Sequence, residues 1–449
     1  MNSAWSMLAF LNELNPLRGA RKPVKAVVPA LLALSLAACA TTPPEPVIQP
    51  VIPEPEPVIE EPVIEEPEPE PVDTGLIPPH MQDQEIVRVA LLLPFSAESS
   101  GLRGESLRLL RAAELALFER AGSNLVMIPK DTGGTPEGAQ SAATAAIADG
   151  ADLIIGPLLG SSVNAAGAIS RANDVPMIAF STDLSTAGDG VYLLSFPPQL
   201  EVARVVEYTS RQGVDRFAYL GPQNAYGMAV YNALQNEAEM NTGYVAAESF
   251  YTGDVEAMSR AASRLAEGVF EPLTPEEADA LRQEEWMPSE DAPFQAVILP
   301  EGGVRLRALA PLLISQPVDP LVVRFLGTGL WMDERLQREP ALAGGWFAGP
   351  DQSSRSRFKT SYEVAYGSEP SRIASLAYDA MALAAHLDGG EDGYSAAALE
   401  NPEGFFGADG LFRFGPDGVI ERGLAVYQMH PRGFREIEPA PQSFEPEAF

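Results

Sequence analysis

The chain has 449 residues, and its 30 basic and 62 acidic side chains give a formal net charge of −32 at pH 7. So negative a chain is repelled by nucleic acid and by anionic lipid head groups, which excludes nucleic-acid binding. Its single cysteine excludes a disulfide within the chain, and its length allows a large hydrophobic core without one.

Residues 1–38 have the pattern of an export signal. Basic residues come first, an apolar stretch follows, and small residues end the segment: Arg18, Arg21, Lys22 and Lys25, then 26–36, then Ala37 and Ala38. This order is typical of a secretory signal peptide. An apolar stretch so short does not span a bilayer stably. A translation start at Met7 would shorten the leader and leave the pattern unchanged.

Cys39 follows this signal directly. The sequence Leu36-Ala37-Ala38-Cys39 resembles the lipobox of bacterial lipoproteins, which are cleaved before the cysteine and acylated on it. A lone cysteine is otherwise most often a buried apolar residue, but Cys39 precedes any segment able to form a core. We therefore expect lipidation of Cys39. Ala40 stands where aspartate retains enterobacterial lipoproteins at the inner membrane, which favours an outer-membrane lipoprotein facing the periplasm; the inner membrane is the alternative.

Residues 39–85 are predicted to hold the lipid anchor and an extended spacer. Between Pro43 and Pro79 the tripeptide Pro-Val-Ile recurs among acidic residues, without a basic one. Proline fixes φ and removes backbone donors, and like charges repel, so the segment favours a polyproline-II-like form. At about 3.1 Å per residue it would reach roughly 115 Å. Two interpretations stay open: reach from the membrane towards a partner, or a low-complexity linker with no required length.

The globular part begins near Glu85, and two runs of alternating strands and helices follow. The first run has predicted strands at 86–94, 125–128, 152–155 and 175–179. The helices predicted between them are at 105–121, 135–149 and 163–172. The second run starts after Pro197-Pro198, with helices at 200–211, 228–240, 255–267 and 304–313 and strands at 216–220, 244–251, 296–299 and 322–326. Such alternation predicts parallel βαβ units. The expected fold class is α/β, with two lobes that each contain a doubly wound, mainly parallel sheet.

Between the second and third strands of the second run lies a polar, acidic insert at 268–293. It contains four prolines and one predicted short helix at 275–285, which Thr274 and early acidic residues favour at its N-terminus.

Short motifs occur in a fixed order along this alternation. They are the strand and proline at 89–94, Asp131-Thr132-Gly133-Gly134, Ile155-Gly156-Pro157-Leu158, Ala179-Phe180-Ser181-Thr182, Tyr226-Gly227, Tyr378-Asp379-Ala380, Phe406-Gly407-Ala408-Asp409-Gly410-Leu411 and Phe414-Gly415-Pro416-Asp417-Gly418. The last two predict a hairpin with a Pro-Asp-Gly turn. In this order the motifs resemble type I periplasmic binding proteins of the leucine-binding-protein branch, over about residues 86–435.

The resemblance implies three crossings of the chain between the lobes, near 195–199, 327–331 and 399–404. The first lobe would then contain 86–196 and 330–399. The second would contain 197–329 and 400–435. Residues 436–449 would form an acidic, proline-containing tail.

The sequence offers little for catalysis. His80, His386 and His430 have no second histidine or cysteine at ligand spacing, so no metal site is expected. There is no Gly-x-Ser-x-Gly elbow and no P-loop. We expect His386 on a helix surface and Asp131 in a turn. We predict no cofactor and no enzymatic activity.

Six residues are candidates to line a ligand cleft. The resemblance implies that hydroxyl groups after the third and fourth strands hold a ligand carboxylate, and that a second-lobe tyrosine and glutamate face them; the positions are Ser161, Ser162, Ser181, Thr182, Tyr226 and Glu301. Glu301 would suit an ammonium group. Ordinary N-capping is an equal alternative for the serines. Asn224-Ala225 before the tyrosine departs from the amino-acid receptors, as does the lack of an aromatic clamp beyond Phe95.

Two classes of function fit this sequence. Lipoproteins called penicillin-binding protein activators carry this fold and stimulate a bifunctional peptidoglycan synthase by contact. The anchor and spacer favour this interpretation, with a peptidoglycan synthase as partner and the lipid as the only membrane contact. The enterobacterial activator has a helical repeat domain where this chain has its spacer, so the contact need not be the same. The alternative is a membrane-anchored receptor that passes a branched-chain or other amino acid to an ABC importer.

We expect Cys39→Ser to abolish lipid labelling, because the thiol is the group that would be acylated. The protein should then move from membrane to soluble periplasmic fractions. Labelling cells with a fatty-acid analogue measures both effects, and Ser35→Ala in the signal is the matched control. Equal labelling of the two variants would contradict the lipoprotein prediction.

Overall fold

In the computed structural model the described residues are 85–444, except 123, 268–269, 389 and 391. The predicted signal, Cys39, the spacer and His80 lie outside them, as do residues 445–449. Within the described ranges, no helix is long and apolar enough to cross a membrane.

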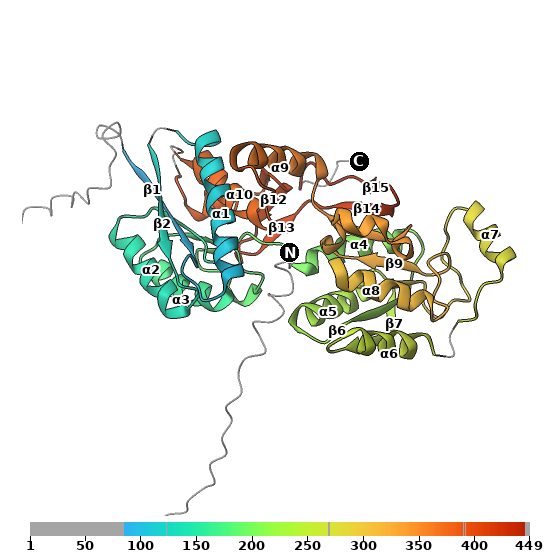
Figure 1. The fold of residues 1–449 in the computed structure, drawn as a ribbon. Coiled ribbons are helices and arrows are strands. Elements are labelled where there is room, and N and C mark those ends of the chain that lie inside the picture. Colours follow the sequence, from blue (N-terminus) through green and yellow to red (C-terminus); the bar gives the residue numbers. More distant parts are fainter. Residues whose placement is uncertain (1–84, 123, 268–269, 389, 391, 445–449) are drawn as a thin grey trace, which may run out of the picture. The chain divides into compact units, whose positions relative to one another are not determined.

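The first lobe contains a five-stranded parallel sheet in the order β2-β1-β3-β4-β5 (Figure 1). Its strands are β1 (Val87–Leu93), β2 (Leu125–Asp131), β3 (Leu153–Ile155), β4 (Met177–Ala179) and β5 (Val191–Leu193). The helices are α1 (Ser100–Arg120), α2 (Pro136–Ala148) and α3 (Gly160–Ala172), and a short 3-10 helix, η3 (Leu184–Thr186), precedes β5. The Thr135 hydroxyl accepts from the Gly138 N–H at the start of α2, and Pro136 stands in the first turn.

The second lobe contains a seven-stranded sheet in the order β15-β14-β10-β9-β8-β6-β7. Its strands are β6 (Arg216–Pro222), β7 (Tyr244–Tyr251), β8 (Ala296–Ile298), β9 (Arg324–Gly327), β10 (Trp346–Gly349), β14 (Ala425–His430) and β15 (Gly433–Glu438). The last two are antiparallel and the others parallel. Its helices are α4 (Pro198–Arg211), α5 (Ala225–Met240), α6 (Val255–Ala266) and α8 (Gly303–Ile314), with 3-10 helices η4 (Gly329–Trp331), η5 (Glu334–Arg338) and η6 (Pro340–Leu342).

Both sheets are buried on both faces. In β1, Val89 and Leu91 join one hydrophobic cluster, and Ala90 and Leu92 join another on the opposite face. The alternation follows from the two-residue period of a strand. Helices therefore cover both faces of each sheet, and the predicted doubly wound α/β class is confirmed.

Strand pairing moves the expected lobe boundaries. β10 pairs with β9 and β14, so residues 330–349 belong to the second lobe and not to the first. The expected crossing near 327–331 therefore lies at about 349–352. The short apolar run of β10 carries no alternation that distinguishes one sheet from the other, so its position depends on its tertiary contacts.

The C-terminal hairpin is also in the other lobe from the one expected. β11 (Phe405–Gly407), β12 (Gly410–Phe414) and β13 (Ile420–Arg422) form a small antiparallel sheet with the predicted Pro-Asp-Gly turn. Their side chains join the first-lobe core, and Val419 bridges to Leu193. Two helices also join the first-lobe core: α9 (Gln352–Tyr366) and α10 (Ala374–Leu387), which pack against α1. The short α11 (Ala396–Leu399) follows α10 in the chain and precedes β11. The third crossing is therefore at about 422–425.

The predicted acidic tail begins inside a strand. Residues 436–438 belong to β15, which pairs with β14, and Ala440 is buried in the second-lobe core. The prediction that 436–449 is a tail is wrong for this part, because the charged residues of β15 lie on an exposed sheet edge while its backbone completes the sheet.

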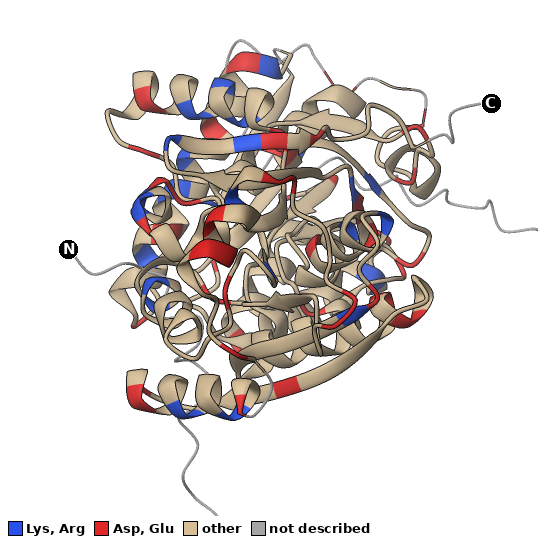
Figure 2. Ribbon diagram, turned by 90° about the vertical axis from the view of Figure 1, so that its right-hand side faces the viewer, with Lys and Arg blue, Asp and Glu red and all other residues tan. Residues whose placement is uncertain are grey.

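The acidic insert contains the expected short helix, α7 (Pro275–Gln283). Thr274 and Glu277 form a capping box, and no side chain of α7 is buried. The insert is fixed to the second lobe at Trp286, since the Arg324 guanidinium lies 4.3 Å from the Trp286 ring centre and 4.6 Å from that of Trp346. Burial between these rings lowers the pKa of Arg324 to about 10. Acidic and basic residues are both distributed over many helices and loops (Figure 2).

We expect Leu91→Ala to lower the free energy of unfolding by about 2–5 kcal/mol, because it leaves a cavity at a fully buried position. Leu107→Ala is the matched control, since Leu107 is 46% exposed on α1. Its effect should stay within about 0.5 kcal/mol. Denaturant unfolding monitored by tryptophan fluorescence measures both, and equal losses would contradict the central position of β1.

Candidate functional site

The six candidate residues lie where strands of the two parallel sheets end. Ser161 and Ser162 stand in the first turn of α3 after β3, Ser181 and Thr182 follow β4, Tyr226 begins α5 after β6, and Glu301 lies between β8 and α8. The carboxyl ends of parallel strands are where ligands bind in open α/β sheets. Each lobe thus places its candidate residues at strand ends, but no hydrogen bond among the described residues joins the candidates of one lobe to those of the other.

In the first lobe, two of the four hydroxyl groups are engaged by the protein itself. Ser162 is buried and its hydroxyl donates to the Thr135 carbonyl over 3.4 Å. The buried Ser181 hydroxyl accepts from the Asp183 N–H over 3.0 Å. Ser161 and Thr182 are exposed.

The N-capping interpretation of the serines fails at α3. Its N-cap is Leu159, and no side chain caps this helix. The first N–H groups of α3 therefore have no side-chain acceptor, and such groups attract anions.

In the second lobe, both predicted ligand-binding side chains already have hydrogen-bond partners within that lobe. The Tyr226 hydroxyl lies 2.8 Å from the Thr328 hydroxyl, and burial, followed by the nearby Glu201 charge, raises the pKa of Tyr226 well above its usual value. Glu301 is 7% exposed and accepts from the Tyr251 hydroxyl at 2.8 Å and from Arg305 Nε at 2.9 Å. The carboxylate that was expected to meet an ammonium group already has an arginine beside it.

A buried ion pair that the sequence did not indicate links the two lobes. Glu201, in the first turn of α4, accepts from Arg372 Nη2 at 2.6 Å and from the Gly329 N–H at 3.0 Å. The Arg372 guanidinium also lies 5.0 Å from the ring centre of Phe196 in the first crossing. A Cβ at Gly329 would lie 2.4 Å from Glu201 Oε1 and 2.6 Å from Arg372 Nη2, so a larger residue here would require the ion pair to shift.

Nothing local distinguishes Glu201 from an ordinary first-turn acidic residue, which the helix dipole favours anyway. Arg372 and Gly329 are distant from it in sequence, so the pair becomes visible only in the fold.

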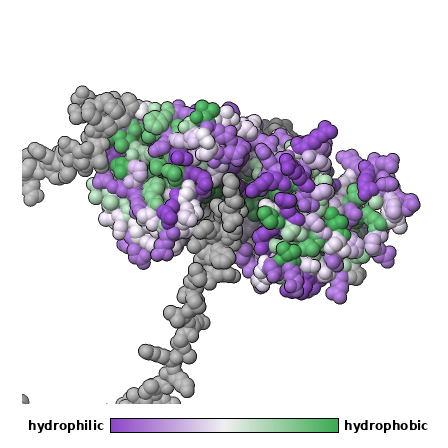
Figure 3. All heavy atoms as spheres, viewed as in Figure 1, coloured by the Kyte–Doolittle hydropathy of each residue, from purple (hydrophilic) through white to green (hydrophobic). Residues whose placement is uncertain are grey.

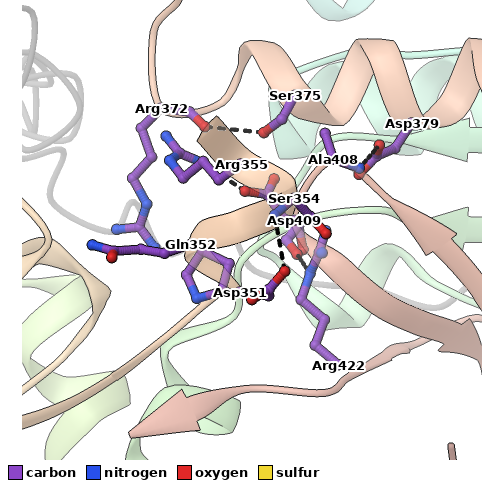
Figure 4. A network of polar contacts seen from close by, with 12 residues as sticks. Asp351, Gln352, Ser354, Arg355, Arg372, Ser375, Asp379, Ala408, Asp409 and Arg422 are labelled. Atoms are coloured by element: carbon purple, nitrogen blue, oxygen red, sulfur yellow. Dashed lines mark hydrogen bonds and ion pairs between the residues drawn. The ribbon is translucent and has the colours of Figure 1, made fainter. Parts of the chain in front are cut away.

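A second polar cluster lies in the first lobe beside the crossings (Figure 4). Asp379 of α10 accepts from the Ala408 N–H at 2.5 Å, and Asp409 accepts from Arg355 Nη1 at 2.6 Å. Burial and the neighbouring Asp409 raise the pKa of Asp379 to about 7. Burial lowers the pKa of Arg422, whose Nε donates to the Ser195 carbonyl at 2.9 Å.

The remaining candidates are in the positions expected from the sequence. His386 is exposed on α10. Asp131 is the last residue of β2, and it accepts from the Ser96 and Gly133 N–H groups where the following turn begins. Burial alone would raise the pKa of Asp131, but these hydrogen bonds lower it below its usual value. Among the described residues, no group of three or more histidine, cysteine or acidic side chains could hold a metal ion.

Residues 86–268 match the family model described as periplasmic binding protein. The chain has the type I periplasmic binding protein fold. The expected resemblance to the leucine-binding-protein branch is confirmed by solved structures that cover most of this chain. These similarities do not show the expected resemblance to penicillin-binding protein activators, which stays a prediction.

Three of these structures come from binding proteins of this fold. A Rhodospirillum rubrum protein assigned to branched-chain amino acid ABC transport is 17% identical, with a TM-score of 0.63 over 78% of this chain and 100% of that one. The leucine-binding protein LivK of Thermotoga maritima is 16% identical, with a TM-score of 0.54 over 79% and 99%. LivJ of Streptococcus pneumoniae, solved with isoleucine, is 16% identical, with a TM-score of 0.52 over 79% and 100%.

At such identities these likenesses establish the fold alone. A curated relative is the uncharacterized protein RP748 of Rickettsia prowazekii (strain Madrid E), 21% identical over 187 residues. The match covers 42% of this chain and 49% of that protein, so the chain spans about half the length of this relative.

We expect Arg372→Met to lower the free energy of unfolding by about 3–5 kcal/mol, because it leaves the buried Glu201 carboxylate without its cation. Arg260→Met is the matched control, since its ion pair with Glu256 is exposed and should contribute at most about 1 kcal/mol. Denaturant unfolding compares the two variants. Equal losses would mean that the Glu201 pair is no stronger than a surface pair.

Proposed function

We propose that this protein is an outer-membrane lipoprotein that acts by contact, as an activator of a peptidoglycan synthase. The observation that carries the proposal is that Glu301 and Tyr226, the predicted ligand-binding residues of the second lobe, are already hydrogen-bonded to other side chains. Glu301 is neutralised by Arg305 and bonded by Tyr251, and the Tyr226 hydroxyl is bonded to Thr328. An amino acid would have to displace these partners before its ammonium group could reach the carboxylate. A hydrogen bond to a charged group contributes about 1.5–3 kcal/mol, so this displacement is costly.

The predicted anchor and spacer support the same function. A lipid at Cys39 would hold the protein at a membrane, and a spacer of roughly 115 Å would let the folded part meet a distant partner. A receptor that collects solute gains little from such reach.

An amino-acid receptor for an ABC importer is the second candidate. Two observations favour it: solved relatives of this fold include LivJ with isoleucine, and the first turn of α3 has no side-chain cap beside the exposed Ser161. A ligand carboxylate could be held there by N–H groups and hydroxyls. This candidate requires Glu301 to exchange Arg305 for the ligand.

One experiment separates the two candidates. The full chain is added to purified bifunctional peptidoglycan synthases of the same bacterium, and the same protein is screened by thermal shift against the amino acids. We expect faster glycan polymerisation and no stabilisation by amino acids. A ligand at 100 times its dissociation constant would stabilise the fold by about 2.7 kcal/mol, which such a screen detects.

The double variant Ser181→Ala with Thr182→Ala provides the control. Stimulation of the synthase should survive it, because neither hydroxyl would take part in contact with a protein partner. Tight amino-acid binding by the wild type, lost in this variant, would make the protein a transport receptor. Failure of every synthase to respond would remove the activator proposal.

A further inference from the structure

Arg422, the last residue of β13, lies where the chain leaves the first lobe for the second. Its Nε donates to the Ser195 carbonyl of the first crossing, and its guanidinium lies 4.5 Å from the ring centre of Phe196. Its two terminal nitrogens are buried and have no hydrogen-bond acceptor among the described residues. A buried guanidinium usually uses all its donors, so this one can take another acceptor.

Two buried carboxyl groups lie beside this arginine. Asp379 and Asp409 are each 1% exposed. Each uses one oxygen in a hydrogen bond, with Ala408 and Arg355, and the Oδ2 of each has no partner in the described part of the chain. A Cβ at Gly407 would lie 2.5 Å from the Asp379 carboxyl group, which shows how closely the backbone encloses it.

The other charges that face this site are already paired. From α9, Arg355 bonds Asp409, and at the start of α10, Arg372 bonds Glu201 of α4. Asp379 and Arg422 therefore remain as two groups of opposite charge that are not hydrogen-bonded to each other. Each has a buried polar atom without a partner among the described residues.

Charged side chains on α1 that face α10 are also engaged. Glu119 and Arg120 bond the Tyr378 hydroxyl, and Glu105 bonds Ser371. The only histidine of α10, His386, is exposed and lies edge-on to Phe405. These groups therefore offer no alternative partner for Asp379.

We propose that Asp379 is a buried proton-binding site that controls whether Arg422 stays on the first crossing or turns to Asp379. The neighbouring Asp409 carboxylate, which is paired with Arg355, opposes a second negative charge in the same enclosed site. With a proton on Asp379, the cation has only the Ser195 carbonyl and the Phe196 ring. When that proton leaves, Asp379 becomes a charged acceptor, and a charge-assisted hydrogen bond with Arg422 competes with these contacts.

The switch acts on the joint between the lobes. Ser195 and Phe196 belong to the first crossing, and Arg422 begins the third. When Asp379 is protonated, the contacts of Arg422 with Ser195 and Phe196 hold the first and third crossings together. When the proton leaves, Arg422 turns to Asp379 and these contacts weaken. Because the pKa of Asp379 is raised to about 7 in the native protein and is near 3.9 in an unfolded chain, its contribution to stability is largest below about pH 4 and decreases as the pH rises through 7.

Hydrogen exchange of the full chain between pH 5 and 9 tests the switch. After correction for the intrinsic exchange rate, we expect the backbone amides of Leu194, Ser195 and Phe196 to lose protection as the pH rises in the wild type. In Asp379→Asn, which cannot ionise, they should stay protected throughout. Glu421→Gln is the matched control, since it removes the same charge from an exposed neighbour of Arg422 that pairs with Arg413. It should keep the wild-type response.

A response that persists in Asp379→Asn, or no response in the wild type, would overturn the proposal. If Asp379→Asn does not fold, infrared difference spectroscopy of the wild type decides instead. The carbonyl band of a protonated aspartic acid should disappear between pH 6 and 8. A protein that shows no such band at pH 6 contains no such proton-binding site.

Discussion

The central strands of both sheets are covered by helices on both faces, and this burial decides where polar groups can lie. Val89 and Leu91 of β1 face one helix layer while Ala90 and Leu92 face the other. A polar side chain in the middle of such a strand would lose its hydration without gaining a partner. Polar groups therefore collect where strands end, which is where Ser181 and Glu301 lie. The position of the candidate site thus follows from how the core is built.

The lobes are joined by three crossings, and polar contacts stabilise each of them. The Ser195 carbonyl of the first accepts from Arg422. At the second, the Tyr427 hydroxyl donates to the Pro350 carbonyl at 2.8 Å and accepts from the Gln352 N–H at 3.2 Å. The Glu201–Arg372 pair adds a direct link between α4 and the start of α10. The connection between the lobes therefore depends on charged and polar side chains as well as on packing.

The candidate residues illustrate why a fold does not by itself imply a function. One solved structure of this fold was determined with isoleucine, and this chain has hydroxyl groups and a glutamate at the ends of its strands. Yet Glu301 is bonded to Arg305 from the helix that follows it, α8, and the Tyr226 hydroxyl is bonded to Thr328. Phe118 and Val364 are large apolar side chains that are exposed. On the face drawn in Figure 3, hydrophobic areas lie among hydrophilic ones.

The sequence by itself determined the α/β class, the two runs of alternation, the capped helix of the insert and the turn of the C-terminal hairpin. These features depend on contacts between residues close in the chain, such as Thr274 with Glu277, and on the two-residue and 3.6-residue periods of apolar side chains. Only the tertiary structure decided the rest. β10 and the hairpin entered lobes other than those expected because short apolar segments fit either sheet, and packing against β9 or against the first-lobe core selects one. The Glu201–Arg372 pair and the Asp379–Asp409 site join residues far apart in sequence, so no local pattern indicates them, and only the meeting of the crossings brings their charges together.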